Sequence, residues 1–499
     1  MYPIEFFYRS VSRVPSNIAL ETNDSQLTYA ELAEQVNRAA ASLMALDEML
    51  GSRVCICGYN SSAHLVAWLA VLASGKVWVP LYPTNGREEL QRCARWAGAS
   101  IILASEDLTE VFNGLDAEVI CLDEWVSATG QQPAVSRPIW STREPPNLSA
   151  TQAIKFTGGT TGKPKGVQQP YRAWNTNIVT QLDAYGFDES MRYLTAAPIT
   201  HGTSTYILPA LAVGGTLVIT DRPRPAELLE IISCKRITTV FVPPTMIYMM
   251  LNEARHQPEA LPDLRHLIYG AAPMQPDAIE EALAVFGPVL HSTYGQTEAP
   301  QIATYIGPDE LAQPELRNSV GRPTLLTSVA ILDGEVIRNT PGVEGEIVIR
   351  GDLLMTGYWQ DEEKTAAAFH DGWLKTGDFG LFDNLGYLFI KGRIKELIIT
   401  GGFNVYPSDV EPILALHPAV RDVAVFGVPD SKWGEAVHAV VELNSGQEVS
   451  PDVLVSFVRE KLGPVKTPKN IQVWGKIPRN PFGKVNKQAL VNEYLKQDD

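Results

Sequence analysis

Short apolar segments alternate with amphipathic segments along most of the chain. Helical spacing in LTYAELAEQVNRAAASLMAL is followed by the strand-like VCICGYN and by an apolar helical stretch, SAHLVAWLAVLAS. The same alternation returns further on, for example in RYLTAAPI and GGTLVIT. Strands that alternate with helices at this spacing form parallel sheets covered by helices. The pattern therefore predicts the α/β fold class.

The pattern changes near residue 320. VAILDGEVI, GEIVIRGDLLMTGYW and GWLKTGDFGLFDNLGYLFIKG are strand-like segments punctuated by glycines, and they indicate a small β-rich subdomain. The last segment, roughly residues 395–499, has helix and strand signals of its own. It is long enough to form a small α+β domain.

Length, composition and charge limit the classes of function. A chain of 499 residues is long enough for two or more domains, and 45% hydrophobic residues supply ample core. The net charge of −16 disfavours nucleic acid and anionic membranes as partners. A phosphate-bearing ligand would therefore need a place where cations are concentrated locally.

Cysteine use and apolar runs indicate the compartment. The five cysteines are scattered and show no zinc-binding spacing, which is typical of a reduced, cytoplasmic protein. The first seventeen residues lack the apolar core of a signal peptide. The longest apolar runs, such as HLVAWLAVLASGKVWVP, are interrupted too early to span a bilayer, so we expect no stable membrane insertion.

A glycine-rich segment, FTGGTTGKPKGV at residues 156–167, has the composition of a phosphate-binding loop. Glycines allow backbone N–H groups to approach phosphate oxygens, and lysines add positive charge. The spacing excludes a Walker A loop, because Thr157 stands five residues before Gly162 and Pro164 follows Lys163. The segment is either a phosphate loop of another kind or a Gly/Thr-rich surface loop.

Later motifs identify the kind of loop. With the glycine loop, an ordered set of motifs closely resembles the adenylate-forming superfamily of acyl-CoA synthetases, non-ribosomal adenylation domains and firefly-type luciferases. The resemblance spans nearly the whole chain, from LTYAEL to Lys484. The motifs are YGQTE (294–298), GEIVIRGDLLMTGYW (345–359), WLKTGDFG (373–380), KGRIKELIITGGFNVYPSDVE (391–411) and IPRNPFGKVNK (477–487), and GVPDSKWGEAV (427–437) favours the acyl-CoA synthetase branch.

The resemblance implies a fold and a reaction. The fold has a large AMP-binding domain, residues 1–392, with two α/β sheet subdomains and a β-barrel-like subdomain. A small mobile α+β domain, residues 395–499, follows a boundary near Arg393–Lys395 and carries the catalytic lysine. In the reaction, a carboxylate attacks the α-phosphorus of ATP, and a nucleophile then displaces AMP from the acyl-AMP. The implied cofactors are ATP and Mg²⁺, with CoA as co-substrate.

The resemblance also implies phosphate and metal contacts. In YGQTE, Glu298 holds Mg²⁺, Thr297 hydrogen-bonds the α-phosphate and acts in catalysis, and Tyr294, beside Gly295, stacks on adenine. A hard cation such as Mg²⁺ prefers oxygen ligands and usually takes only one or two protein carboxylates. The loop residues implied to grip the β- and γ-phosphates of ATP are Thr157, Gly158, Gly159, Thr160, Thr161, Gly162 and Lys165.

The remaining nucleotide contacts come from later in the chain. Asp378 is implied to accept hydrogen bonds from both ribose hydroxyls. Arg393 either contacts ribose or phosphate or forms a hinge salt bridge. Lys484 reaches the carboxylate and the α-phosphate together, and losing such a contact costs about 3–4 kcal/mol. Lys395 matches the hinge and Gly402 the route of a pantetheine thiol, although both could be simple turn residues.

The acid site is implied less directly. His201 matches a position near the acyl group, where it gates the pocket, acts as a base towards the nucleophile, or only packs. Tyr269, Gly270 and Ala271 are implied to line the acid pocket or the adenine pocket, with Gly270 and Ala271 as nucleotide contacts, and they stand where many acyl-CoA synthetases have Ser/Gly-Gly-Ala. A tyrosine there would shorten or reshape the pocket, which favours a compact, cyclic or aromatic acid.

Two functions compete for the adenylate. The first is an acid–CoA ligase for a small cyclic, aromatic or medium acid. The alternative is an amide-forming ligase, similar to coronafacic-acid ligases, that joins the acid to an amino acid or amine. Loading of a carrier protein comes third. A non-catalytic adenylate-binding protein would have lost Lys484 or Glu298, and both are present.

Overall fold

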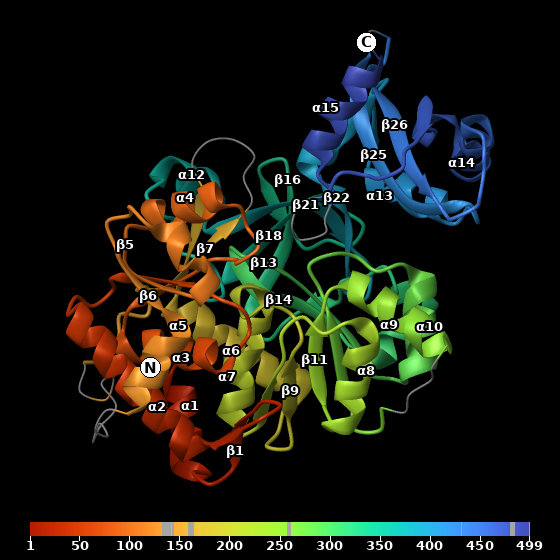
Figure 1. Cartoon of the computed structure of the whole chain (residues 1–499). Helices are drawn as coiled ribbons and strands as arrows, with labels where there is room; N and C mark the ends of the chain where they lie inside the picture. The colour runs from red at the N-terminus through yellow and green to blue at the C-terminus, as the bar shows by residue number, and fades with distance from the viewer. Residues whose placement is uncertain are drawn as a thin grey trace. The chain divides into compact units, whose positions relative to one another are not determined.

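The computed structural model describes residues 1–131, 141, 144–157, 164–256, 261–430, 432–479 and 485–498. The chain forms two compact units, coloured from red to blue along the sequence in Figure 1. Unit 1 contains Met1–Val329 and Ile349–Leu374, and unit 2 contains Ala330–Val348 and Lys375–Asp499. The finer boundary near Arg393–Lys395 stays a prediction.

A seven-stranded sheet forms one layer of unit 1, in the order β19-β8-β7-β4-β3-β5-β6. Its parallel strands are β3 (Arg53–Cys57), β4 (Val77–Pro80), β5 (Ala99–Ala104), β6 (Glu118–Cys121) and β7 (Thr151–Thr157). Two antiparallel strands complete it, namely β8 (Lys165–Pro170) and β19 (Gly357–Tyr358). The helices that come before, between or after these strands in the sequence are α2 (Tyr29–Leu46), α3 (Ser62–Ser74), α4 (Arg87–Ala97), α5 (Leu122–Gly130) and α12 (Glu362–Ala367).

Both faces of this sheet are buried, as the apolar strand VCICGYN predicted. Side chains alternate along β3, so Val54 and Ile56 pack in the cluster that includes α3. Cys55 and Cys57 pack on the opposite face, in the cluster that includes residues of α4. Helix α3 is apolar on every side and almost completely buried, which is typical of an internal helix.

A nine-stranded sheet forms the rest of unit 1, in the order β15-β14-β13-β12-β11-β9-β10-β1-β2. The parallel strands are β1 (Ile18–Glu21), β9 (Arg192–Thr195), β10 (Thr216–Ile219), β11 (Thr239–Val242), β12 (His266–Tyr269) and β13 (Leu290–Gln296). The antiparallel strands are β2 (Gln26–Thr28), β14 (Ala299–Ile306) and β15 (Arg322–Pro323). Its helices are α1 (Glu5–Arg13), α6 (Tyr171–Tyr185), α7 (Ser204–Val213), α8 (Pro225–Cys234), α9 (Pro244–His256), α10 (Pro276–Phe286) and α11 (Pro308–Leu311).

The predicted β-rich segment forms a six-stranded sheet, in the order β17-β16-β18-β21-β20 with β22 paired to β21. These strands follow one another closely along the chain, as the glycine-punctuated pattern predicted. Their bounds are β16 (Thr327–Asp333), β17 (Val336–Arg338), β18 (Gly345–Gly351), β20 (Phe369–His370), β21 (Trp373–Phe382) and β22 (Leu388–Arg393).

The C-terminal part of unit 2 is the predicted small α+β domain. Strand β26 has two buried faces: Val437, Ala439 and Val441 pack in one cluster, and Val440 packs in the other with Tyr494. The strands are β23 (Ile398–Thr400), β24 (Phe403–Val405), β25 (Val420–Asp430), β26 (Gly434–Leu443) and β27 (Asn470–Val473). The helices are α13 (Pro407–Ala415), α14 (Pro451–Lys466) and α15 (Lys487–Asp498).

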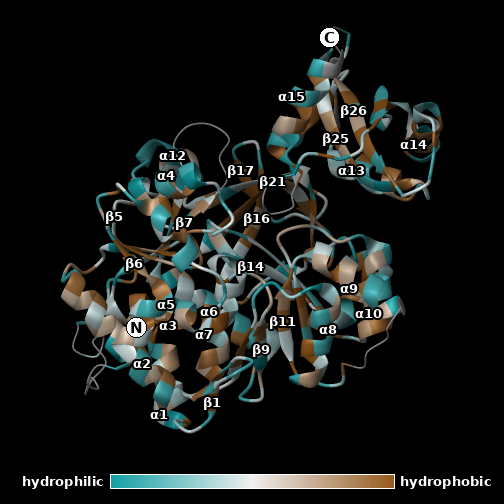
Figure 2. Ribbon diagram, viewed as in Figure 1, coloured by the Kyte–Doolittle hydropathy of each residue, from teal (hydrophilic) through white to brown (hydrophobic). Residues whose placement is uncertain are grey.

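Hydrophobic residues are concentrated on the sheet strands, for example along β11 and β25 in Figure 2. Removal of this apolar surface from water is the main driving force for packing helices on the sheets. Within the part of the chain that the structure describes, no helix is both long enough and apolar enough to cross a membrane.

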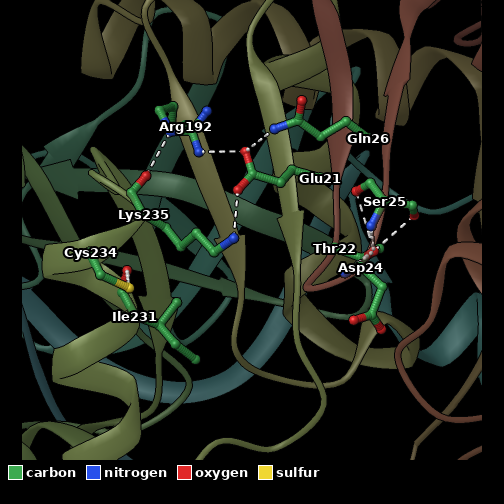
Figure 3. A network of polar contacts seen from close by, with 9 residues as sticks. All are labelled: Glu21, Thr22, Asp24, Ser25, Gln26, Arg192, Ile231, Cys234 and Lys235. Atoms are coloured by element: carbon green, nitrogen blue, oxygen red, sulfur yellow. Dashed lines mark hydrogen bonds and ion pairs between the residues drawn. The ribbon is translucent and has the colours of Figure 1, made fainter.

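A buried carboxylate joins three separate segments of unit 1 (Figure 3). Glu21, at the end of β1, binds Arg192 of β9 and Lys235 after α8, each at 2.9 Å. Gln26 Nε2 donates a third hydrogen bond to Glu21 at 3.3 Å. Burial would raise the pKa of Glu21, but the hydrogen bonds from Arg192 and Lys235 outweigh it and hold the pKa below its ordinary value.

We predict that Glu21→Gln lowers the free energy of unfolding at pH 7 by about 1–3 kcal/mol, because two cations lose their charged partner. The folded pKa lies below the unfolded one, so this stabilisation is present above the unfolded pKa and is lost as pH falls through the folded pKa. Urea unfolding at several pH values measures it. A difference that does not shrink on acidification would contradict the prediction.

The control for this experiment is Glu34→Gln. Glu34 pairs with Arg38 one helical turn away and is 45% exposed. An exposed pair of this kind contributes little, so we expect a change within about 0.5 kcal/mol.

The turn between β13 and β14 depends on a close backbone approach at Gly295. A Cβ at Gly295 would lie 2.6 Å from the carbonyl carbon of Gln301 and 2.9 Å from the carbonyl oxygen of Ala299. Gln301 has a φ of +69°, which is unusual for a residue with a side chain. Its Nε2 donates to the Tyr206 hydroxyl at 2.8 Å. The two strands can meet in this way only if residue 295 has no side chain.

We predict that Gly295→Ala lowers thermal stability, with a cost of about 1–3 kcal/mol from overpacking against backbone that cannot move aside. Gly130→Ala is the matched control, because a Cβ at Gly130 meets nothing within 4 Å. The control should be neutral or slightly stabilising. Equal melting temperatures for the two variants would show that the approach at Gly295 imposes no constraint.

Candidate active site

The predicted phosphate loop connects two paired strands of unit 1. Thr157 ends β7 and Lys165 begins β8, and these two residues are direct partners in the antiparallel ladder. The loop between them is therefore the turn of a hairpin. The structure places both ends of the loop, whereas Gly158, Gly159, Thr160, Thr161 and Gly162 lie outside the described residues.

One tyrosine links the loop to the predicted metal ligand. The Nζ of Lys165 lies 5.3 Å from the centre of the Tyr358 ring. The Tyr358 hydroxyl donates to Glu298 Oε1 at 2.9 Å. Burial and the charge of Glu298 raise the pKa of Tyr358 well above its usual value, so the hydroxyl keeps its proton. Residues from three separate motifs thus meet in one chain of contacts.

Glu298 lies in a well-supported turn. Thr297 and Glu298 connect β13 to β14, whose residues Gln296 and Ala299 are paired. The carbonyl of Thr297 accepts from Gln169 Nε2 at 2.9 Å, and the carbonyl of Glu298 accepts from Met355 N at 2.8 Å. These contacts fix the backbone of the turn and leave the side chains of Thr297 and Glu298 partly exposed.

The chemistry around Glu298 fits Mg²⁺ and not a protein-enclosed metal. Among the described residues, no cluster of three or more His, Cys, Asp or Glu side chains could hold a metal ion. A cation here would take one carboxylate from the protein and its other oxygens from phosphate and water. Mg²⁺ binds in this way in nucleotide sites.

Tyr294, Gly270 and Ala271 come together at the carboxyl ends of neighbouring parallel strands. Gly270 follows β12, which pairs with β13, the strand of Tyr294. A Cβ at Gly270 would lie 3.0 Å from the carbonyl oxygen of Thr293, and Ala271 has a φ of +68°. Ligands of open α/β sheets bind at this edge. Tyr269, just before them, is buried, and burial raises its pKa to about 12.

His201 lies in an irregular turn, Ile199–Thr203, directly before α7. Its Nδ1 is 2.7 Å from Thr200 Oγ1, and its ring packs edge-on against Tyr82 with centres 4.7 Å apart. Burial, and to a smaller extent the charge of Lys155, lower the pKa of His201 to about 4. The imidazole is therefore neutral near pH 7, and the lowered pKa makes it a weak proton acceptor.

Unit 2 brings Asp378 and Arg393 together. They are partners in the ladder between β21 and β22, and Arg393 Nε lies 2.6 Å from Asp378 Oδ1. The carboxylate is almost fully buried, whereas half of the arginine side chain is exposed. Arg393 therefore forms a salt bridge whose partner is the predicted ribose ligand, and its contact with ribose or phosphate stays a prediction.

Two other predicted residues of unit 2 lie in turns. Lys395 is exposed in the short turn Ile394–Glu396. Gly401 and Gly402 form a two-residue turn between β23 and β24, with φ values of +57° and +83°. Such a turn favours glycine at both positions. Backbone conformation alone therefore requires a glycine at Gly402, whatever passes beside it.

Lys484 lies outside the described residues, but its surroundings in sequence are anchored. Lys487, three residues further, begins α15 and lies 2.7 Å from Glu396 and 3.4 Å from Glu411. The start of the last helix is thus tied to the segment that follows Lys395.

Sequence reasoning missed Tyr358 and Lys155. Tyr358 belongs to a quoted motif, but no spacing links it to Glu298, which is 60 residues away. The available signal for Lys155 was a lysine inside an otherwise apolar strand segment, AIKF.

Comparisons with known proteins agree with this geometry. The family model for AMP-binding enzyme matches residues 7–359, and the model for AMP-binding enzyme C-terminal domain matches residues 409–484. The medium/long-chain-fatty-acid–CoA ligase FadD8 of Mycobacterium tuberculosis is 32% identical, and the match covers 96% of this chain and 88% of that protein.

Two solved structures resemble the whole chain. One is o-succinylbenzoate CoA synthetase (MenE) from Bacillus subtilis with an acyl-adenylate intermediate, at TM-score 0.89, 28% identity and 97% coverage of each chain. The other is the amide bond synthetase McbA from Marinactinospora thermotolerans, at TM-score 0.86 and 29% identity, covering 99% of this chain and all of that one. As the ordered motifs predicted, the chain belongs to the AMP-binding enzyme family of adenylate-forming enzymes.

Proposed function

We propose that this protein is an ATP-dependent acid–CoA ligase. The carboxylate of the acid attacks the α-phosphorus of ATP, and pyrophosphate leaves. The CoA thiol then attacks the acyl carbon of the acyl-AMP and loses its proton, and AMP leaves with the electrons of the broken bond. The observation that carries the proposal is the contact chain from Lys165 through Tyr358 to Glu298, beside the ends of the phosphate loop.

In the first half-reaction, the hairpin holds the triphosphate. Thr157, the loop residues 158–162 and Lys165 bind the β- and γ-phosphates through backbone N–H groups, hydroxyls and an ammonium. Glu298 would hold Mg²⁺, which when bound offsets negative charge on the phosphates. Tyr358 keeps the Glu298 carboxylate in place by donating to one of its oxygens.

Further residues are proposed to contact the nucleotide and the reacting centre. Thr297 donates to the α-phosphate, and Tyr294, Gly295, Gly270 and Ala271 form the adenine side. Asp378 is held by Arg393 and accepts hydrogen bonds from the ribose hydroxyls. Lys484 places its ammonium between the attacking carboxylate and the α-phosphate, where it offsets the repulsion of two anions. Lys395 acts at the hinge.

Of the roles open to His201 beside the acyl group, its buried neutral ring supports a gate, because a pKa of about 4 makes it a weak base. The buried Tyr269 at the end of β12 supports a compact, cyclic or aromatic acid. We place the protein in the cytoplasm, in keeping with its five free cysteines, of which Cys55, Cys57 and Cys93 are buried.

A basic aromatic surface on unit 2 favours CoA as the acceptor. Trp433 is 38% exposed, with Lys432 Nζ 4.7 Å and Lys469 Nζ 5.2 Å from its ring. An exposed indole suits stacking on adenine, and ammonium groups suit the phosphates of CoA. The turn at Gly402 leaves open space where a Cβ would be, which suits the passage of pantetheine.

A second candidate is an amide-forming ligase that transfers the same acyl group to an amine. The similarity to McbA over the whole chain favours this candidate. The adenylating residues are the same in both candidates, so only the product of the second half-reaction separates them.

We predict that Tyr358→Phe raises the Mg²⁺ concentration needed for half-maximal activity by about tenfold or more, because Glu298 loses the hydrogen bond that orients it. Pyrophosphate exchange at varied Mg²⁺ measures this effect. Tyr2→Phe, which removes an exposed hydroxyl that donates to the carbonyl of Glu144, is the control. An unchanged Mg²⁺ requirement in Tyr358→Phe would contradict the assignment of Glu298.

The acceptor is tested by incubating the protein with ATP, Mg²⁺ and a panel of small aromatic, cyclic and fatty acids. One arm contains CoA, the other contains amino acids without CoA, and mass spectrometry identifies the products. We expect a thioester in the CoA arm only. An amide formed without CoA would establish the second candidate instead.

Lys484→Ala should lower acyl-AMP formation by about 10²–10³-fold; undiminished formation would refute the proposed mechanism.

A further inference from the structure

One buried lysine of unit 1 has no part in the proposed reaction. Lys155, in β7, is only 9% exposed. Its Nζ lies 4.9 Å from the ring centre of Trp78 and 5.5 Å from that of Trp174. Both indoles are almost completely buried. We call Lys155 and these two rings the tryptophan box.

The tryptophan box contains a cation without an anionic partner. Lys155 Nζ contacts Ser204 Oγ at 3.0 Å and the carbonyl oxygen of His201 at 3.4 Å, and both of these groups are neutral. In the described part of the chain, no carboxylate pairs with Lys155, and residues 158–163, which follow β7 in the sequence, include no Asp or Glu. Burial alone lowers the pKa of Lys155 to about 7. An anion bound here would offset that cost and keep the lysine charged.

Another buried lysine of this fold does have a carboxylate partner. Lys76 is fully buried, and its Nζ contacts the Asp47 carboxylate at 3.8 Å. It also donates to the carbonyl oxygen of Asp47 at 2.5 Å and to Ser52 Oγ at 2.9 Å. The fold thus provides Lys76 with a counter-charge of its own. A buried charge without one is costly unless something else compensates it.

The indoles around Lys155 also have unused donors. The Nε1 atoms of Trp78 and Trp174 are buried and have no hydrogen-bond partner among the described residues. The same holds for Trp68, whose ring centre lies 5.6 Å from that of Trp78. Buried donors in native structures are normally paired. Two of these unpaired donors belong to the indoles that pack against the Lys155 ammonium.

The tryptophan box lies beside the proposed acid site. Lys155 and Thr157 are two residues apart in β7, so they share one face of the strand at a separation of about 7 Å. Lys155 also contacts the turn that carries His201. An acid with its reacting carboxylate beside Thr157 would have its distal group within reach of Lys155.

We propose that Lys155 is a specificity-determining residue that binds a second anionic oxygen group of the acid, of which a second carboxylate is the simplest. This inference rests on the proposed function, because it concerns the acid that is adenylated. The two tryptophans exclude water from the ammonium. Without water to screen its charge, the ammonium attracts the anion more strongly.

The test compares matched acids that differ only in the distal group. Hexanoate is paired with hexanedioate, and benzoate with 1,4-benzenedicarboxylate. ATP–pyrophosphate exchange gives kcat/KM for each acid with the wild-type protein, Lys155→Met and Lys155→Arg. We expect the wild type to prefer the diacid of at least one pair tenfold or more. Lys155→Met should lose that preference, mainly through KM for the diacid, and change monoacid activity less than threefold. Lys155→Arg should keep the preference.

Lys76→Met is the matched control, because it removes another buried lysine that lies outside the proposed site. It should lower stability and leave the ratio of diacid to monoacid activity unchanged. Equal losses on both acids in Lys155→Met would mean that Lys155 only supports the fold, and this would overturn the inference. A wild-type preference for the monoacid in both pairs would also overturn it, even where the variant does not fold. Absence of exchange with every acid would overturn the proposed function instead.

Discussion

The antiparallel pairing of β7 with β8 is the contact on which the proposed site in unit 1 depends. It joins Thr157 to Lys165 and so fixes both ends of the predicted phosphate loop. The same strand β8 pairs with β19, which carries Tyr358, and its Gln169 holds the backbone of the Thr297 turn. A single short strand therefore positions residues that are far apart in the sequence. Its own position follows from β7, which is parallel to β4 within the sheet.

Buried charged residues that support the fold and those of the proposed site differ in how completely the chain itself pairs their charge. Glu21 and Lys76 are removed from water and meet opposite charges supplied by the fold, as expected of groups that stabilise the structure. Asp378 also has a partner, and half of that partner's side chain is exposed. Lys155 has only neutral partners among the described residues. The charge compensation that the fold itself supplies therefore decreases from Glu21 to Lys155.

Local patterns predicted the fold well, and they predicted the site only where motifs were contiguous. The alternation of buried side chains in β3 involves only four adjacent residues, so it can be recognised directly in the sequence. The contact between Tyr358 and Glu298 depends on a two-residue strand that no periodicity could reveal. No sequence pattern predicts the ion pairs of Glu21 either, because its charged partners lie in two distant segments. The proposed role of Lys155 depends on the absence of a carboxylate beside it in the described structure. The sequence lists the charged residues but does not show which of them lie close together.

The anchoring of Lys487 has a consequence for engineering. Its contacts with Glu396 and Glu411 join the first turn, the first helix and the last helix of the C-terminal domain. The two ends of the segment from Ile394 to α15 are therefore joined by ion pairs. A chimera between related enzymes should exchange both ends together. A junction placed inside this segment would separate a lysine from its two carboxylates and leave the terminal helix without its electrostatic anchor.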